Sequence, residues 1–372
     1  MPPTPPQRPR ETLPDALRAL ALISVLVVNA IGYAAAPWGP TLGFRTPPDS
    51  AWASLTQGAV AAVLHGKGYT TLAFVFGMAL WLAARHRPRA EALQRGQRRQ
   101  RRLLQVGIFH GVFLYFGDIL TLYALVGRPL LRRLHRPWGA LRRHFWHALA
   151  WAVLAKLVLL ALTLMAAESP ARADTPALST VQGAWAFFQL NAGFYAAIQV
   201  VALLVGGPVM YLCMLGGVAA ARLRLLTHRR WRPLWRRGLW LAGPPLLVLS
   251  VAHGWAWAVH DPAADIDPWI EALGDLIALP VAACYLAIAV LASDGGRARW
   301  CAVLAPLGQR TLSLYVGHSA LCLLLLSGAG WALAPTTLQT VVACLGLWLL
   351  ALAGARLSGR RRWPLEAWLA RR

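Results

Sequence analysis

The chain has 372 residues, of which 58% are hydrophobic and only 14% are charged. Soluble domains carry about 25% charged and roughly 45–50% apolar residues, so the composition excludes an ordinary water-soluble protein. A formal net charge of +23 would indicate nucleic-acid binding in a soluble chain. Here the arginines alternate with apolar stretches, and we expect no nucleic-acid partner.

Apolar stretches of roughly 18 residues or more, the length that spans a bilayer, recur along the chain. They predict an all-α polytopic membrane protein with about ten transmembrane helices in a single bundle. The expected spans, in chain order, are 16–35, 52–84 with a break near 66, 103–116, 119–131, 145–167, 193–221, 238–258, 270–292, 302–328 and 336–356. Segment 181–195, rich in aromatic residues at helical spacing, is expected to lie flat at the outer interface.

Arginines cluster in alternate connections, at residues 85–102, 128–143, 222–237 and 360–372. The intervening connections, 36–51, 168–180 and 260–268, hold at most one arginine each. By the positive-inside rule both termini then face the cytoplasm, and the basic segments contact anionic membrane lipid. The expected domain organisation is a disordered N-terminus (1–14), a single transmembrane bundle (15–357) and a basic C-terminal tail (358–372).

Common site motifs are missing from the sequence. Five cysteines lie in or at the ends of apolar spans, so we expect neither disulfides nor a metal site. The chain has no nucleophile-elbow, zinc-protease, phosphate-loop or C-x-x-C pattern. Candidate chemistry must therefore come from ionisable residues inside the apolar spans, which are costly there and functional by default.

The first span carries Arg18 one turn inside the membrane and Asn29 eleven residues further on. Arg18 can bind the phosphates of a nucleotide cofactor bidentately, or it can belong to a simple helix start together with Asp15. Asn29 lies about 16 Å along the helix, where it can serve the site or hydrogen-bond a neighbouring helix.

Lys67 and Lys156 are the only lysines beside 35 arginines. A lysine can lose its charge when desolvated, whereas an arginine cannot. Lys67, between two glycines, can therefore be a functional group in a site or a residue that caps a helix at the membrane interface. Lys156 is about eleven residues from either end of its span, too far to snorkel, so it should face a cavity or an acidic partner.

His110 and Asp118 interrupt the apolar run "GIFHGVFLYFGDILTLYALVG". An unbroken helix would separate them by about 12 Å along its axis, with Asp118 at the outer surface and His110 below it. His110 is the natural base near neutral pH, or a buried structural histidine. Asp118 either caps the next helix or, if the chain bends, orients His110. His318, in "LSLYVGHSALCLLLL", has the same two interpretations as His110.

Four segments resemble the signature blocks of the YeiB family of bacterial inner-membrane proteins. They are "ALRALALISVLVVN", "GKGYTTLAFVFGMAL", "RRLLQVGIFHGVFLYFGDILTLYALVG" and "GRRRWPLEAWLARR", in the family's order along nearly the whole chain. That family is similar to the transmembrane acyltransferases, whose late block maps onto Gly308, Ser313, Tyr315 and His318. The chain departs from the patterns at Asn29, where acyltransferases have histidine, and at His65 and Leu314.

The resemblance implies acyl transfer from cytoplasmic acyl-CoA, acetyl-CoA first, to an extracytoplasmic hydroxyl or amine. It places His110, Asp118, Lys67 and Asn29 in catalysis, and Arg18 and Arg310, both nearer the inner face, with the cofactor. We expect His318, Tyr315 and Lys156 to contact the substrate. The expected location is the bacterial inner membrane, and the protein can be a monomer or a homodimer. A secondary transporter or exporter built around Lys156, or a non-catalytic membrane scaffold, are the rival hypotheses.

Overall fold

The computed structural model describes residues 12–34, 50–167, 177–260, 267–293, 298–359 and 361–370. These residues are predominantly helical, and none of them forms a strand. In chain order the helices are α1 (Thr12–Ala34), α2 (Ala51–Val63), α3 (Lys67–Ala84), α4 (Arg89–Phe113), α5 (Leu120–Leu131), α6 (Trp138–Ala167), α7 (Ala184–Val201), the π segment η1 (Ala202–Gly206), α8 (Gly207–Leu223), the short η2 (Arg229–Trp231), α9 (Arg232–Val259), α10 (Asp267–Ala292), α11 (Arg299–Gly308), α12 (Thr311–Leu326), α13 (Thr337–Leu357) and α14 (Pro364–Leu369).

Seven helical stretches in the described ranges are long and apolar enough to cross a membrane. This confirms an all-α architecture and indicates a membrane protein. The predicted number of about ten is not reached by this criterion, because α5 and α12 are shorter apolar helices and the first half of α4 is crowded with arginine. At the ends, helix α1 already begins at Thr12 and the tail contains α14; residues 1–11 lie outside the described part.

The predicted break near residue 66 is confirmed. Helix α2 ends at Val63 and α3 begins at Lys67, and between them Gly66 has φ +75°, a left-handed conformation that glycine adopts without strain. A Cβ on Gly66 would also lie 2.8 Å from the Ala278 side chain. The two helices together span Ala51–Ala84.

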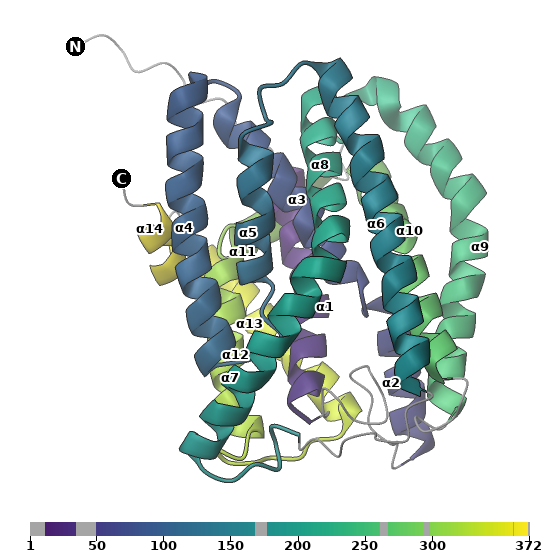
Figure 1. Ribbon diagram of the computed structural model, residues 1–372, viewed down its shortest axis with the longest axis vertical. Helices are drawn as coiled ribbons and strands as arrows, with labels where there is room; N and C mark the ends of the chain where they lie inside the picture. Colours follow the sequence, from purple (N-terminus) through teal and green to yellow (C-terminus); the bar gives the residue numbers. More distant parts are fainter. Residues whose placement is uncertain are drawn as a thin grey trace.

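Two expected boundaries are wrong. The expected span 302–328 is split into α11 and α12 by Gln309 and Arg310, just after Pro306, which lacks a helical N–H donor. Segment 181–195 forms no separate interfacial helix, since α7 begins at Ala184 and continues through η1 into α8 as one stretch ending at Leu223. Figure 1 shows the bend where α7 meets α8.

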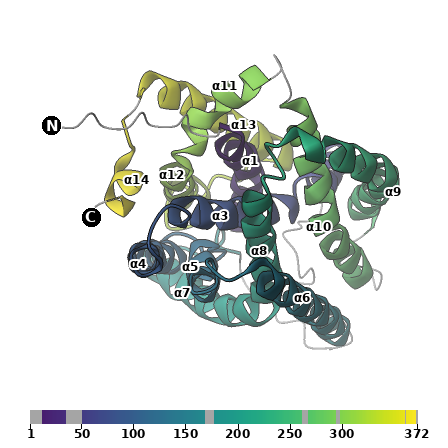
Figure 2. The ribbon, with the colours of Figure 1, turned by 90° about the horizontal axis from the view of Figure 1, so that it is seen from above.

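Helix α1 lies at the centre of the bundle, packed against α3, α11, α12 and α13 (Figure 2). Glycines let neighbouring helices approach closely, as is common in membrane bundles. On α3, a Cβ at Gly77 would lie 1.9 Å from the Met214 carbonyl oxygen of α8. On α8, a Cβ at Gly217 would lie 1.9 Å from the Phe74 oxygen of α3. The crossing of α3 and α8 therefore requires both glycines.

Three basic connections lie at the same end of the bundle. The turns joining α3 to α4, α5 to α6 and α8 to α9 are all at the upper end in Figure 1. These turns belong to the arginine clusters at 85–102, 128–143 and 222–237. The charge pattern and the path of the helices therefore agree on which connections share a side.

Candidate functional site

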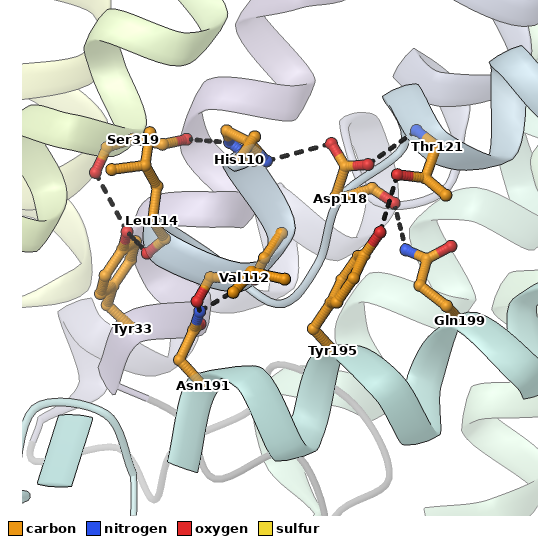
Figure 3. A network of polar contacts seen from close by, with 11 residues as sticks. Tyr33, His110, Val112, Leu114, Asp118, Thr121, Asn191, Tyr195, Gln199 and Ser319 are labelled. Atoms are coloured by element: carbon orange, nitrogen blue, oxygen red, sulfur yellow. Dashed lines mark hydrogen bonds and ion pairs between the residues drawn. The ribbon is translucent and has the colours of Figure 1, made fainter. Parts of the chain in front are cut away.

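The turn between α4 and α5 brings His110 and Asp118 together (Figure 3). Helix α4 ends at Phe113, and the chain doubles back before α5 begins at Leu120. As a result, His110 Nδ1 lies 3.0 Å from Asp118 Oδ1, and both side chains are fully buried. The expectation that Asp118 lies two turns above His110 is wrong, because the helix does not continue past Phe113.

Asp118 also caps α5, as one interpretation of the sequence predicts. Its Oδ2 accepts a hydrogen bond of 2.7 Å from the Thr121 backbone N–H, and its backbone oxygen accepts one of 2.8 Å from Gln199 Nε2. Gly107 on α4 allows this approach, since a Cβ there would lie 2.5 Å from the Thr121 nitrogen and 2.9 Å from Asp118 Oδ2. The carboxylate therefore caps a helix and faces the imidazole at once.

A serine from a distant part of the chain completes the arrangement. Ser319 Oγ of α12 lies 2.8 Å from His110 Nε2, and Ser319 is fully buried. Tyr33 of α1 holds the two helices together, because its hydroxyl donates to Ser319 O at 3.0 Å and to Leu114 O at 2.7 Å. Sequence reasoning missed Ser319, although it directly follows His318 in the segment that resembles the late acyltransferase block.

Hydroxyl, imidazole and carboxylate thus lie in line across three segments, from Ser319 through His110 to Asp118 (Figure 3). With a proton on Nδ1 toward the carboxylate, Nε2 is free to accept the serine proton. A nucleophile next to a base that a third group orients is the arrangement used in covalent acyl transfer.

Three further predicted residues lie around this triad. The Tyr315 ring packs on the His110 ring, with centroids 4.5 Å apart and planes inclined by 30°. Asn29 lies beside the Tyr315 hydroxyl, and Asn29 Nδ2 makes no hydrogen bond of ordinary geometry within the described chain. His318 is adjacent to Ser319, but its Nε2 faces sulfur atoms, 3.4 Å from Cys322 and 3.6 Å from Cys344.

The two lysines belong to a second polar cluster. Lys67 is buried, and its Nζ donates to the Ala61 carbonyl oxygen at 2.7 Å. Lys156 of α6 pairs with Asp275 of α10 at 2.9 Å, which confirms the acidic partner predicted for it. Asp275 also acts electrostatically on Lys67 and on His65. The structure therefore does not bring Lys67 or Lys156 to His110.

The two predicted cofactor arginines have different surroundings. Arg18 is partly buried and its NH1 lies 2.5 Å from Asp15 Oδ1. Arg310 is buried and its guanidinium binds backbone carbonyl oxygens at 2.6–2.7 Å, those of Pro306, Gly359 and Arg361. Arg310 thereby fastens the chain before α14 to the break between α11 and α12.

Helix α14 is held to the start of α12 by Glu366. Its carboxylate accepts from the Ser313 backbone N–H at 2.9 Å and from the Ser313 hydroxyl at 2.5 Å. The carboxylate thus satisfies an N–H group in the first turn of α12, where negative charge is favourable. The "PLEAW" segment of the tail therefore supports the helix that carries Ser319.

Comparison with known proteins gives one family. Residues 220–372 match the family described as "Protein of unknown function (DUF418)". The matched segment contains His318 and Ser319, whereas His110 and Asp118 lie before it. No curated protein matches the chain.

Proposed function

We propose that the protein is a transmembrane acyltransferase of the YeiB type, with Ser319, His110 and Asp118 as its catalytic group. The observation that carries the proposal is the contact series of 2.8 Å from Ser319 Oγ to His110 Nε2 and 3.0 Å from Nδ1 to Asp118 Oδ1. We further propose that the chain crosses a bacterial inner membrane about ten times and that both termini lie in the cytoplasm. The shared end of the basic connections supports this orientation.

In the proposed reaction, Ser319 Oγ attacks the thioester carbonyl of acyl-CoA while its proton passes to His110 Nε2. The C–S bond then breaks, the thiol leaves with the proton from His110, and an ester remains on Ser319. An acceptor hydroxyl or amine next gives its proton to His110 and attacks the ester. The bond to Oγ breaks and Ser319 recovers its proton. Burial of the three side chains favours transfer over hydrolysis by keeping water away.

The remaining roles follow from position. Tyr315, whose ring packs on His110, and Asn29, beside the Tyr315 hydroxyl, supply donors suited to a developing oxyanion. Arg18 is the better candidate for the phosphates of the coenzyme, because its side chain is partly exposed whereas Arg310 is buried and bound to three backbone oxygens. The phosphates would compete with Asp15 for the Arg18 guanidinium. Asp118 orients His110 and balances the imidazolium that forms.

The experiment is to incubate the purified protein with acetyl-CoA and to measure the intact mass. We expect one added acetyl group, removable by hydroxylamine, together with release of thiol. Ser319→Ala should lose the adduct. Ser250→Ala is the matched control, because Ser250 is also a buried helical serine but has no hydrogen-bond partner for its hydroxyl in the described structure. Unchanged labelling in Ser319→Ala, or none in the wild type, contradicts the proposal.

The second candidate is a secondary transporter, favoured by the pair of Lys156 and Asp275. Its side chains are 25% and 37% exposed, and such intramembrane pairs occur on ion pathways. Proton flux into proteoliposomes would then be abolished by Lys156→Met and left intact by His110→Ala. The acyltransferase proposal expects the reverse for acyl-CoA turnover. If neither substitution changes either readout, a scaffold role is favoured.

A further inference from the structure

A groove separate from the triad runs along the side of the bundle between α5, α6 and the junction of η1 with α8. It has a volume of about 560 Å³, and of these helices α6 lies outermost in Figure 2, with α8 behind it next to α3. Its walls are mainly apolar, formed by Leu125, Val126, Ala148, Leu203 and Pro208. Helix α6 and the stretch α7–α8 are long enough to span a membrane, so this groove faces acyl chains.

The wall at η1 has an unusual backbone. Residues Ala202–Gly206 form a π segment, a helix defect that is found frequently at functional sites. A Cβ on Gly207, which lines the groove, would have only ordinary contacts, the nearest being Val126 Cγ2 at 3.7 Å. At Gly207, therefore, α8 presents no side chain to the groove, and a methyl group there would fit against the neighbouring atoms without a clash.

Polar side chains gather at one end of the groove, near the basic connection between α5 and α6. His144 Nε2 and the Tyr211 hydroxyl lie 2.6 Å apart, and both residues line the groove. Arg133 and Arg136, in the connection beside this end of the groove, both act electrostatically on His144 and on Tyr211.

The positive charge at this end has no carboxylate partner among the described residues. In the ranges that the structure describes, neither Arg133 nor Arg136 pairs with a carboxylate. Arg133 NH1 donates to the Pro129 backbone oxygen, which fixes the side chain but leaves its charge uncompensated. An apolar groove ending at unpaired arginines is complementary to an anion that carries a long hydrocarbon chain.

We propose that this groove binds an anionic glycerophospholipid of the membrane. Its phosphate lies against Arg133, Tyr211 and His144, because guanidinium and phosphate form charge-assisted hydrogen bonds. One acyl chain follows the apolar wall past Leu203 and Gly207. A phosphatidylcholine headgroup carries a compensating positive charge and lacks this preference, whereas a free phosphate lacks the chain.

The test measures thermal unfolding of the purified full-length protein in detergent during titration with phosphatidylglycerol. We expect a saturable rise in Tm that dipalmitoylphosphatidylcholine and glycerol 3-phosphate do not reproduce. Arg133→Gln should weaken the apparent affinity by about tenfold, since one charge-assisted contact is lost. Tyr211→Phe should weaken it by less, and it provides a second route if Arg133→Gln folds poorly.

Two further variants separate the headgroup from the chain. Gly207→Leu should fill the groove and reduce the effect of phosphatidylglycerol while leaving the headgroup residues intact. Arg98→Gln is the charge-matched control, because Arg98 is exposed on α4 away from the groove, and it should behave as the wild type. The proposal is overturned if phosphatidylcholine stabilises equally, if glycerol 3-phosphate suffices, or if Arg133→Gln and Arg98→Gln titrate alike.

Discussion

Substitution of Asp118 separates the chemical role of its carboxylate from its structural role. The side chain has two oxygens with different partners, Oδ1 facing His110 Nδ1 at 3.0 Å and Oδ2 accepting from the Thr121 N–H at 2.7 Å. Alanine removes both contacts. Asparagine keeps an oxygen for the cap but presents an N–H group to the imidazole, which favours the tautomer with a proton on Nε2.

The expected magnitudes follow from these contacts. Loss of the cap costs about 1 kcal/mol, and removal of the carboxylate that lies 3.0 Å from the buried His110 Nδ1 costs about 1–3 kcal/mol. Asp118→Ala should therefore lower the free energy of unfolding by roughly 2–4 kcal/mol, and Asp118→Asn by clearly less. Asparagine favours the tautomer in which Nε2 cannot accept the serine proton, and alanine leaves the imidazole without the group that orients it. Acyl transfer should therefore fall by about 10²–10⁴-fold in both variants.

The assay pairs thermal unfolding in detergent with thiol release from acetyl-CoA. Asp275→Asn is the matched control, because this carboxylate pairs with Lys156 in the second cluster and should leave thiol release unchanged. Full activity in Asp118→Asn would refute the orienting role. Equal unfolding temperatures for Asp118→Asn and Asp118→Ala would refute the cap argument.

Three more predictions concern helix packing and the attachment of the tail. Gly77→Ala places a methyl group 1.9 Å from the Met214 carbonyl oxygen, so α3 and α8 must separate, at a cost of about 1–3 kcal/mol or more. Gly346→Ala meets nothing within 4 Å on α13 and should instead stabilise by about 0.5–1 kcal/mol, both changes being measured by thermal unfolding. Glu366→Ala removes both hydrogen bonds to Ser313, which should release α14 and speed proteolysis of the tail. An unchanged cleavage rate would show that α14 is held by other contacts.

Hydropathy and glycine placement predict the helices well and their breaks unevenly. The break at Gly66 is visible in the sequence because two glycines flank Lys67 in an otherwise apolar stretch. The break at Arg310 is hidden, because apolar residues continue on both sides and two of the carbonyls that bind its buried guanidinium belong to the distant tail. Pro306 and Gly308 are the local signals that could have indicated it.

Among the ionisable residues, the sequence singled out His110 and Asp118 but misjudged the distance between them. A single residue buried in lipid is informative by itself, as the acidic partner of Lys156 confirms. The separation of His110 from Asp118 depends on where α4 ends, and periodicity locates helix ends poorly. Gly117 indicated a turn, but one glycine does not fix the direction in which the chain leaves it.

Ser319 could not be selected from the sequence for a physical reason. A serine in a membrane helix usually satisfies its hydroxyl on a backbone oxygen of its own helix, as Ser327 does with Leu323 O, so the residue type alone carries little information. What distinguishes Ser319 is an imidazole 209 positions away in the sequence. Only the packing of α12 beside the end of α4, fixed by Tyr33, brings the two together. The contact between the Ser319 hydroxyl and the His110 imidazole therefore depends on the fold and not on the local sequence. Measuring the reactivity of this hydroxyl toward a thioester best distinguishes a catalytic triad from a buried polar network.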